Sequence, residues 1–295
     1  MLYEVIIIGA GPAGLAAAIQ LRRYGIEPLL FEREVTGGLL HNANLVENYP
    51  GFPGGVTGPE LVRLMVEQAD QAGVQVTFEA VTSLSYIEPL FQATTPQNTY
   101  QARRAVIATG TQSRRITDFP IPPHLQDRVL YEVFPLLRVH NRKMAIIGGG
   151  DAAFDYALNL SKHNQVTILN RSPQPRCLPL LWQRASSVDA ITYRQGIAVV
   201  KLIDTSTEGL LLECRTVDGV EWLGADYLIG AIGREARLDF LSGIMRDNIT
   251  ALEQRGSLYL IGDVTNGIFR QTAIAVGQGV QAAMRIFQVL EKEKT

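Results

Sequence analysis

Apolar residues in the first part of the chain are grouped in a way that predicts a strand, a helix and a second strand. Residues 2–8 are almost continuously apolar and rich in β-branched side chains, with Glu4 as the interruption. Such a run is typical of a strand that is buried on both faces of a parallel sheet. An Ala- and Leu-rich helix is expected over residues 15–21 and a second strand over residues 28–32. This order is typical of an α/β fold.

The pattern then changes to an irregular segment, a helix and several short strands. Residues 42–58 are rich in Asn, Pro and Gly, and a loop of this length inside a compact domain is usually functional. Apolar residues recur with helical spacing over residues 59–72. Strands are expected at 74–78, 81–86, 90–93 and 99–102, as an antiparallel insertion, and at 105–110, where the chain returns to the parallel sheet.

A second cycle of strand, glycine-rich turn and helix begins near residue 144. The predicted strand 144–147 leads into Gly148-Gly149-Gly150-Asp151-Ala152-Ala153 and a helix over 154–161. Gly148 lies 139 residues after Gly9, which indicates an internal duplication. Strands at 165–169, 228–232 and 257–263, the last ending in Gly-Asp, and a helix at 271–290 complete the chain. The sequence therefore predicts two doubly wound, Rossmann-like dinucleotide-binding domains.

The first glycine motif lies between the predicted first strand and first helix. Gly9 would permit the tight turn, Gly11 would let the backbone approach a pyrophosphate, and Gly14 would let the helix pack on its strand. The pyrophosphate would lie at the positive end of that helix. Glu32, eighteen residues after Gly14, ends the second strand, where a carboxylate can bind ribose hydroxyls. The alternative is a glycine-rich turn in an ordinary α/β protein.

Composition and charge exclude several classes of partner. The 295 residues suffice for two domains, and apolar and charged contents of 46% and 19% are typical of a globular protein. The net charge of −2 gives no electrostatic reason to expect nucleic acid or an anionic membrane surface as a partner. No apolar run has membrane-spanning length, and Cys177 and Cys214 lack metal-type spacing. We expect a cytoplasmic protein with two free thiols and no metal.

Taken together, the motifs resemble those of the low-molecular-weight thioredoxin reductase family along the whole chain. The shared sequences are Gly9-x-Gly11-x-x-Gly14, Gly37-Gly38, residues 46–52 and 57–61, Ala108-Thr109-Gly110, Gly148-Gly149-Gly150-Asp151, residues 262–264 and Arg270-Gln271. The resemblance implies a discontinuous FAD-binding domain at residues 1–112 and 248–295. It implies that an NAD(P)H-binding domain, residues 113–247, is inserted in the first, and that the protein is a homodimer.

The resemblance also implies the residues that bind each cofactor. Asp263 would hold a ribityl hydroxyl of FAD, and Arg270, Gln271 and Ala273 would lie at the pyrimidine edge of the flavin, where a helix N-terminus stabilises negative charge. Asn48 would lie beside the isoalloxazine. The residues expected to bind FAD are Gly9, Gly11, Pro12, Ala13, Gly14, Glu32, Arg33, Gly38, Leu39, Asn48, Thr109, Gly110, Gly262, Asp263, Arg270, Gln271 and Ala273. Those expected to bind pyridine nucleotide are Gly148, Gly150, Asp151, Ala152, Arg171 and Arg176.

Two arginines indicate which pyridine nucleotide is used. The family's clamp for the 2′-phosphate, H-R-R-x-x-x-R, reads Asn170-Arg171-Ser172-Pro173-Gln174-Pro175-Arg176 here. Arginine binds phosphate strongly, and the acid that ends this strand in NAD-selective sites is absent. NADPH is therefore expected, with NADH as the alternative. A second interpretation is that both arginines are solvated at the rim of a domain. Arg234 could line the same pocket.

The chain departs from the family at the redox disulfide. Counted back from Gly148, the two cysteine positions of the C-x-x-C motif hold Tyr131 and Phe134, and Pro135 replaces the aspartate that follows. Leu39 replaces a glutamine beside the flavin. An aromatic ring cannot exchange with a disulfide, so we predict that the chain does not reduce thioredoxin. Tyr131 and Phe134 form either a lid on the isoalloxazine or part of a core.

The predicted function is that of an FAD-dependent NAD(P)H oxidoreductase. The sequence contains no His, Cys or Ser constellation that must act as acid, base or nucleophile, so the chemistry is assigned to flavin N5. Electrons would leave to a non-disulfide acceptor: a ferredoxin or flavodoxin, a quinone, oxygen or another small oxidant. The alternative, from another class, is an FAD-binding flavoprotein without nicotinamide turnover that acts as a binding or regulatory module.

Overall fold

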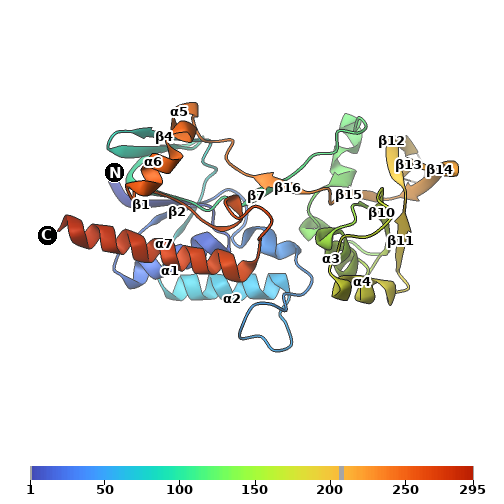
Figure 1. The fold of residues 1–295 in the computed structure, drawn as a ribbon, viewed down its shortest axis with the longest axis horizontal. Coiled ribbons are helices and arrows are strands. Elements are labelled where there is room, and N and C mark those ends of the chain that lie inside the picture. Colours follow the sequence, from blue (N-terminus) through green and yellow to red (C-terminus); the bar gives the residue numbers. More distant parts are fainter. Residues whose placement is uncertain (1, 206–208, 295) are drawn as a thin grey trace. The chain divides into compact units, whose positions relative to one another are not determined.

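The computed structural model describes residues 2–205 and 209–294, and these residues form two compact α/β units (Figure 1). Unit 1 comprises Met1–His41, Val46–Gln112 and Glu235–Thr295, and unit 2 comprises Asn42–Leu45 and Ser113–Arg234. The predicted fold class is confirmed. No helix in the described ranges is both long enough and apolar enough to cross a membrane.

Unit 1 contains both termini and a sheet with helices packed on it. Its elements are β1 (Leu2–Ile8), α1 (Pro12–Arg23), β2 (Leu29–Glu32), a 3₁₀ helix (Gly38–Asn42, whose last residue belongs to unit 2), α2 (Gly58–Gln71), β3 (Val76–Phe78), β4 (Ser83–Ile87), β5 (Leu90–Thr94), β6 (Thr99–Ile107), α5 (Gly243–Asp247), α6 (Ile249–Gln254), β17 (Leu258–Leu260), a 3₁₀ helix (Gly262–Val264) and α7 (Thr272–Glu293).

The sheet of unit 1 has seven strands in the order β3-β2-β1-β6-β5-β4, with β17 also paired to β6. β1 pairs in parallel with β2 and β6, whereas β4, β5 and β6 pair in antiparallel fashion. Val5, Ile6 and Ile7 of β1 are fully buried. Burial on both faces of the sheet is the reason for the nearly continuous apolar run that opens the sequence.

One strand, β6, replaces the two strands predicted at 99–102 and 105–110. β1 pairs with β6 from Gln101 to Ile107 along one edge. The other edge of β6 pairs first with β5, as far as Ala102, and then with β17, from Ala105 onward. The chain therefore stays extended through residues 103 and 104, because β1 continues to pair across the point at which the neighbour on the other edge changes.

Helices α1 and α7 lie side by side in unit 1 (Figure 1). A Cβ atom at Gly279 of α7 would lie 2.2 Å from the carbonyl oxygen of Ala13 in α1, so only glycine allows this approach. The rings of Tyr24 and Phe287 stack with centroids 4.2 Å apart at the other end of the contact. This packing holds the N-terminal turn of α1 in a fixed place for the site described below.

Unit 2 contains a five-stranded parallel sheet in the order β11-β10-β9-β15-β8 and a three-stranded antiparallel sheet, β12-β13-β14. The sequence patterns did not identify β12, β13 or β14. The elements of unit 2 are a 3₁₀ helix (Pro123–Arg128), β8 (Val129–Leu130), a 3₁₀ helix (Phe134–Leu136), β9 (Lys143–Ile147), α3 (Asp151–Leu160), β10 (Gln165–Asn170), α4 (Pro179–Ser186), β11 (Ile191–Gln195), β12 (Ala198–Thr205), β13 (Gly209–Thr216), β14 (Gly219–Ala225) and β15 (Tyr227–Gly230).

The division into units differs from the prediction in two places. Asn42–Leu45, predicted in the first domain, belongs to unit 2, and the second unit ends earlier than predicted. We predicted that the second unit ends at residue 247, but it ends at Arg234. Phe240, Leu241 and Met245 are buried in the core of unit 1, and the N–H of Leu84 donates to the carbonyl of Phe240 at 2.9 Å. Residues 235–247 therefore belong to unit 1. Strands β7 (Thr111–Ser113) and β16 (Arg234–Ala236) pair where the chain passes from unit to unit.

Candidate functional site

In the first glycine loop of unit 1, two glycines are packed closely against backbone atoms, whereas the third has open space beside it. Gly9 has φ +104°, and a Cβ atom there would lie 2.5 Å from the carbonyl oxygen of Ala108. A Cβ atom at Gly14 would lie only 1.9 Å from the carbonyl oxygen of Gly9. At Gly11, in contrast, a Cβ atom would have no described atom within 4 Å. The fold itself requires Gly9 and Gly14, whereas the surface at Gly11 is free for the close approach of a ligand.

Glu32, at the end of β2, holds the glycine loop in place. Its Oε2 accepts a hydrogen bond from the N–H of Ala10 at 3.0 Å. Its Oε1 accepts from the N–H groups of Arg33 and Glu34 at 2.8 and 3.1 Å. Three backbone donors therefore fix the carboxylate at the carboxyl edge of the sheet, where dinucleotides bind in folds of this type.

A cavity of about 310 Å³ lies beside Glu32, within unit 1. The volume is within the range of small-ligand sites and is compatible with a nucleoside. Four residues that the sequence predicted to bind FAD line it: Gly9, Glu32, Arg33 and Thr109. The sequence did not indicate the walls that are supplied by residues 79–82 and by Arg237, Asp239 and Phe240. The hydroxyl of Thr109 donates to the carbonyl of Arg237 at 2.7 Å and so joins two of the lining segments.

The residues predicted at the flavin end come from three separate segments. The side chain of Asn48 donates to Gln271 Oε1 at 2.8 Å, and Gln271 directly precedes α7. Gly262, with φ +75°, lies so close to α1 that a Cβ atom there would be 2.9 Å from Ala13 Cβ. Asp263 follows in the same 3₁₀ helix. The structure thus brings Asn48 to the start of α7, and the Gly262–Asp263 turn to the first turn of α1.

Unit 2 repeats the glycine-loop geometry at the start of α3. Gly148 has φ +151°, and a Cβ atom there would lie 2.5 Å from the carbonyl oxygen of Ala231, whereas a Cβ atom at Gly150 would meet no described atom within 4 Å. Asp151, the first residue of α3, accepts a hydrogen bond from the N–H of Leu178 at 2.7 Å. The open surface again lies at the last residue before a helix, where anions bind favourably.

The segment that carries Arg171 and Arg176 is fixed by the end of β10. Asn170 is buried, and its side-chain amide donates to the carbonyl of Gln174 and accepts from the N–H of Ser172. The N–H of Arg176 donates to the carbonyl of Gly149 at 2.6 Å. The side chain of Arg171 is 79% exposed and lies 3.8 Å from Asp118. A preformed loop therefore presents two exposed arginine side chains beside the second glycine loop.

The two aromatic residues at the disulfide positions lie in different environments. The Tyr131 ring is buried in the core of unit 2, and a Cβ atom at Gly230 would lie 2.8 Å from it. Its hydroxyl accepts from the N–H of Ile116 at 3.0 Å, and the Arg115 guanidinium lies 4.5 Å from the ring centroid. Its burial supports the alternative in which Tyr131 fills a core, while Phe134 is 41% exposed. A lid role for either residue stays a prediction.

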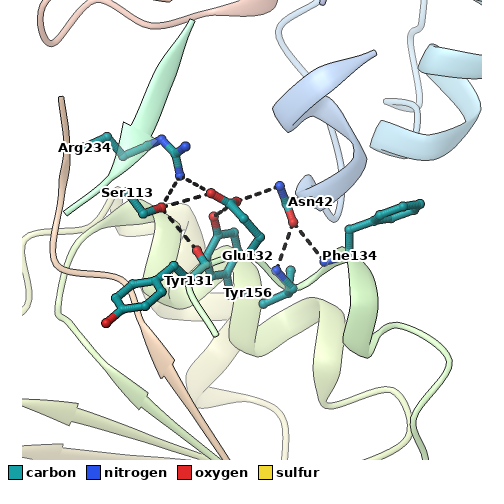
Figure 2. A network of polar contacts seen from close by, with 8 residues as sticks. Asn42, Ser113, Tyr131, Glu132, Phe134, Tyr156 and Arg234 are labelled. Carbon is teal, nitrogen blue, oxygen red and sulfur yellow. Dashed lines mark hydrogen bonds and ion pairs between the residues drawn. The ribbon is translucent and has the colours of Figure 1, made fainter. Parts of the chain in front are cut away.

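Between these two residues, Glu132 is the centre of a polar network within unit 2 (Figure 2). Arg234 forms an ion pair with its Oε1 at 2.6 Å. That Arg234 also lines the 2′-phosphate pocket stays a prediction. The Tyr156 hydroxyl donates to the other carboxylate oxygen at 3.3 Å. Burial, reinforced by the negative charge of Glu132, raises the pKa of Tyr156, so this tyrosine stays a neutral donor.

Both cysteines are poor candidates for redox chemistry. Cys214 is fully buried and Cys177 is partly buried, and neither forms a disulfide. Burial raises the pKa of both thiols, that of Cys214 to about 11. Since the thiolate is the reactive species, neither residue has the properties of a nucleophile.

Replacing Asp155 by Asn should flatten the pH dependence of stability. Burial raises the pKa of Asp155 from 3.8 to about 6, although the Asn44 N–H, which donates to it at 3.0 Å, and Lys162 act in the opposite direction, and Asp151 reinforces the rise. The folded state then binds the proton more tightly than the unfolded state, so this group lowers stability as the pH rises from about 4 to about 6. The loss is at most roughly 3 kcal/mol.

Urea denaturation at several pH values between 4 and 7 tests this prediction. We expect D155N to lose less stability over this range than the unmodified protein, because its uncharged amide keeps an acceptor for Asn44. Equal pH dependence in the two proteins would contradict the raised pKa of Asp155.

Two Rossmann-like units, each with a glycine loop at the start of a helix, are typical of proteins that bind two dinucleotides. The sequence profile of the pyridine nucleotide-disulphide oxidoreductases matches residues 3–279. The chain belongs to this family.

Thioredoxin reductases are among the similar proteins. The bifunctional thioredoxin reductase/thioredoxin of Mycobacterium leprae is 33% identical over 298 residues, which cover 96% of this chain and 65% of that protein. The chain therefore spans less than two thirds of that relative. The thioredoxin reductase of Chlamydia pneumoniae is 29% identical, covering 95% of this chain and 96% of that protein. The crystal structure of Lactococcus lactis thioredoxin reductase matches with a TM-score of 0.86 and 28% identity, covering 98% of this chain and 99% of that chain.

These similarities confirm the resemblance on which the cofactor predictions rest. Thioredoxin reductases use FAD and NADPH. The open surfaces at Gly11 and Gly150 and the cavity beside Glu32 fit that pair of cofactors.

Proposed function

We propose that the chain is an FAD-dependent NAD(P)H oxidoreductase that passes electrons to an acceptor other than a disulfide. The observation that carries this proposal is a contrast within the chain. Both glycine loops have the geometry of nucleotide sites, whereas the cysteine positions of the family hold a buried Tyr131 and a Phe134.

The residues of unit 1 would each contribute to holding FAD. The backbone at Gly11 and the N-terminus of α1 would receive the pyrophosphate, and Glu32 and the cavity beside it would receive the adenosine. Asn48, Gln271 and the N-terminus of α7 would orient the ring system and favour negative charge beside it. When bound, FAD supplies the hydride and electron-transfer chemistry.

Anaerobic stopped-flow absorbance of the flavin after mixing with NADPH or NADH tests this function. We expect NADPH to bleach the flavin completely. If the purified protein contains FAD that neither nucleotide reduces, the alternative holds, and the chain is a flavin-binding module without nicotinamide turnover. A protein that takes up no FAD on reconstitution contradicts both.

Replacing Arg171 by Ala should weaken NADPH binding about ten- to a hundredfold, with little change for NADH. Arg171 is exposed beside the second glycine loop and would bind the 2′-phosphate, which NADH lacks. Arg142→Ala is a matched control, because Arg142 is also an exposed arginine of unit 2 in a long contact, 4.0 Å from Asp226. Equal rates of flavin reduction by NADPH and NADH in the unmodified protein would contradict binding of the 2′-phosphate by Arg171 and Arg176. They would favour the second interpretation, in which both arginines are solvated at the rim of a domain.

Rates of NADPH oxidation in the presence of different oxidants identify the class of electron acceptor. Steady-state NADPH oxidation should be accelerated by at least one of a ferredoxin, a flavodoxin, a quinone or oxygen. If only disulfide substrates accelerate it, the proposed acceptor class is wrong.

A further inference from the structure

The chain crosses between the two units four times. The residues at which unit 2 begins or ends are therefore Asn42, Leu45, Ser113 and Arg234. Glu132 binds three of these four residues. Asn42 and Ser113 each donate a side-chain hydrogen bond to Glu132 at 2.9 Å. Arg234 forms the ion pair with it at 2.6 Å. One carboxylate therefore joins three segments that are far apart in sequence.

The network also fixes the segment that contains Glu132 (Figure 2). Asn42 Oδ1 accepts from the N–H groups of Val133 and Phe134, both at 2.9 Å. Ser113 Oγ accepts from Arg234 at 2.7 Å and also contacts the carbonyl oxygen of Tyr131 at 3.4 Å. Residues 131–134 are thus bound from two sides by residues at the ends of unit 2.

The ion pair between Arg234 and Glu132 is charged and largely buried, and both properties strengthen the network. The side chains of Arg234 and Glu132 are 16% and 32% exposed, so solvent and salt screen their attraction less than that of a surface pair. Charge-assisted hydrogen bonds are about twice as strong as neutral ones. Both carboxylate oxygens of Glu132 are already bound twice within unit 2, which leaves no position for a ligand and indicates an anchoring role.

We propose that Glu132 is a positioning residue that fixes the points at which the chain enters and leaves unit 2. This inference rests on the proposed function, in which FAD binds to unit 1 and the nicotinamide cofactor to unit 2. Hydride transfer depends steeply on the separation and alignment of the two reacting rings. Anchoring the connecting segments therefore supports the rate of hydride transfer without contributing to the binding of either cofactor.

Glu132→Ala and Glu132→Gln test the anchor in the full-length holoprotein. The glutamine keeps the length of the side chain and one acceptor oxygen, but it removes the charge and replaces the second acceptor by an NH2 donor. Glu221→Ala is the matched control, because Glu221 forms an ion pair of similar length with Arg194, 2.7 Å, is about equally exposed, and lies away from the ends of unit 2. FAD content, amide hydrogen exchange and anaerobic flavin reduction over a range of NADPH concentrations are measured for all three variants.

In E132A we expect amide exchange at Val133 and Phe134 to accelerate about tenfold or more, with exchange in β9 unchanged. The limiting rate of flavin reduction should fall about fivefold or more, while the NADPH dissociation constant and the FAD content stay within about twofold. E132Q should give smaller changes in the same direction, and E221A should give none.

Three results would overturn the anchor. Equal acceleration of exchange in β9 and at residues 133–134 would make Glu132 a general stabiliser of unit 2. A limiting rate that is unchanged or raised despite faster local exchange would remove its link to hydride transfer. A weakened NADPH affinity at an unchanged limiting rate would make it part of the binding site. If NADPH does not reduce the flavin of the unmodified protein, the proposed function fails and the transfer role of Glu132 fails with it, whereas the exchange data still decide whether the carboxylate anchors the segments.

Discussion

Replacing Gly14 by Ala should destabilise the protein by at least about 3 kcal/mol, whereas replacing Gly11 by Ala should leave the fold intact and abolish tight FAD binding. At Gly14 the added methyl group would lie 1.9 Å from the carbonyl oxygen of Gly9. That neighbour is backbone in a tight turn and cannot move without displacing α1 from β1. At Gly11 the same methyl group would meet no described protein atom within 4 Å, but it would occupy the surface that the pyrophosphate approaches.

Thermal unfolding followed by circular dichroism, together with flavin absorbance relative to protein absorbance, measures both effects. We expect G14A to unfold at a much lower temperature or to accumulate as insoluble protein. G11A should be folded, with FAD affinity reduced about a hundredfold or more. Gly277→Ala is the control, because Gly277 lies within α7 and a Cβ atom there meets no described atom within 4 Å. That variant should be as stable as the unmodified protein or slightly more stable.

These variants distinguish a ligand site from a glycine turn that serves the fold alone. If G11A retains its full FAD content, the pyrophosphate does not lie where the open surface suggests. If G14A is as stable as the unmodified protein, the contact between Gly9 and α1 is not part of the fold in solution.

We also expect that the protein does not reduce thioredoxin. With NADPH and thioredoxin, the unmodified protein should reduce insulin disulfides no faster than a mixture without it, whereas Lactococcus lactis thioredoxin reductase, run in parallel, should be active. Thiol–disulfide exchange needs two thiols that can reach the same substrate. This chain has one buried and one partly buried cysteine, both with a raised pKa, and they form no disulfide with each other.

A double variant, Cys177→Ala with Cys214→Ala, shows whether any disulfide reduction depends on the two thiols. Activity that is present in the unmodified protein and lost in the double variant would show that these thiols are the redox pair. Activity that persists in the double variant would show that the chain reduces disulfides without cysteine, contrary to the mechanism argued above. Inactivity of both proteins, with flavin reduction by NADPH intact, is the expected outcome.

The turn geometry of the glycine loop in each unit could be predicted from the sequence because its constraints are local. Gly9, Gly14 and Glu32 lie within one strand–helix–strand segment, and the turn that they form depends on backbone sterics at neighbouring positions. The same holds for Gly148 and Asp151 in the second unit. The apolar run of β1 likewise reports its burial directly, because a strand covered on both faces has no polar alternation.

The tertiary structure decided the features that depend on contacts between distant residues. Only packing shows that Tyr131 fills the core under Gly230, that residues 235–247 join unit 1, and that Arg237 and Asp239 line the cavity beside Glu32. Glu132 and Asn42 are 90 residues apart in sequence, and Glu132 and Arg234 are 102 apart. No periodicity or motif links such positions, because their contact results from the way the whole chain folds and not from the conformational preference of any single segment.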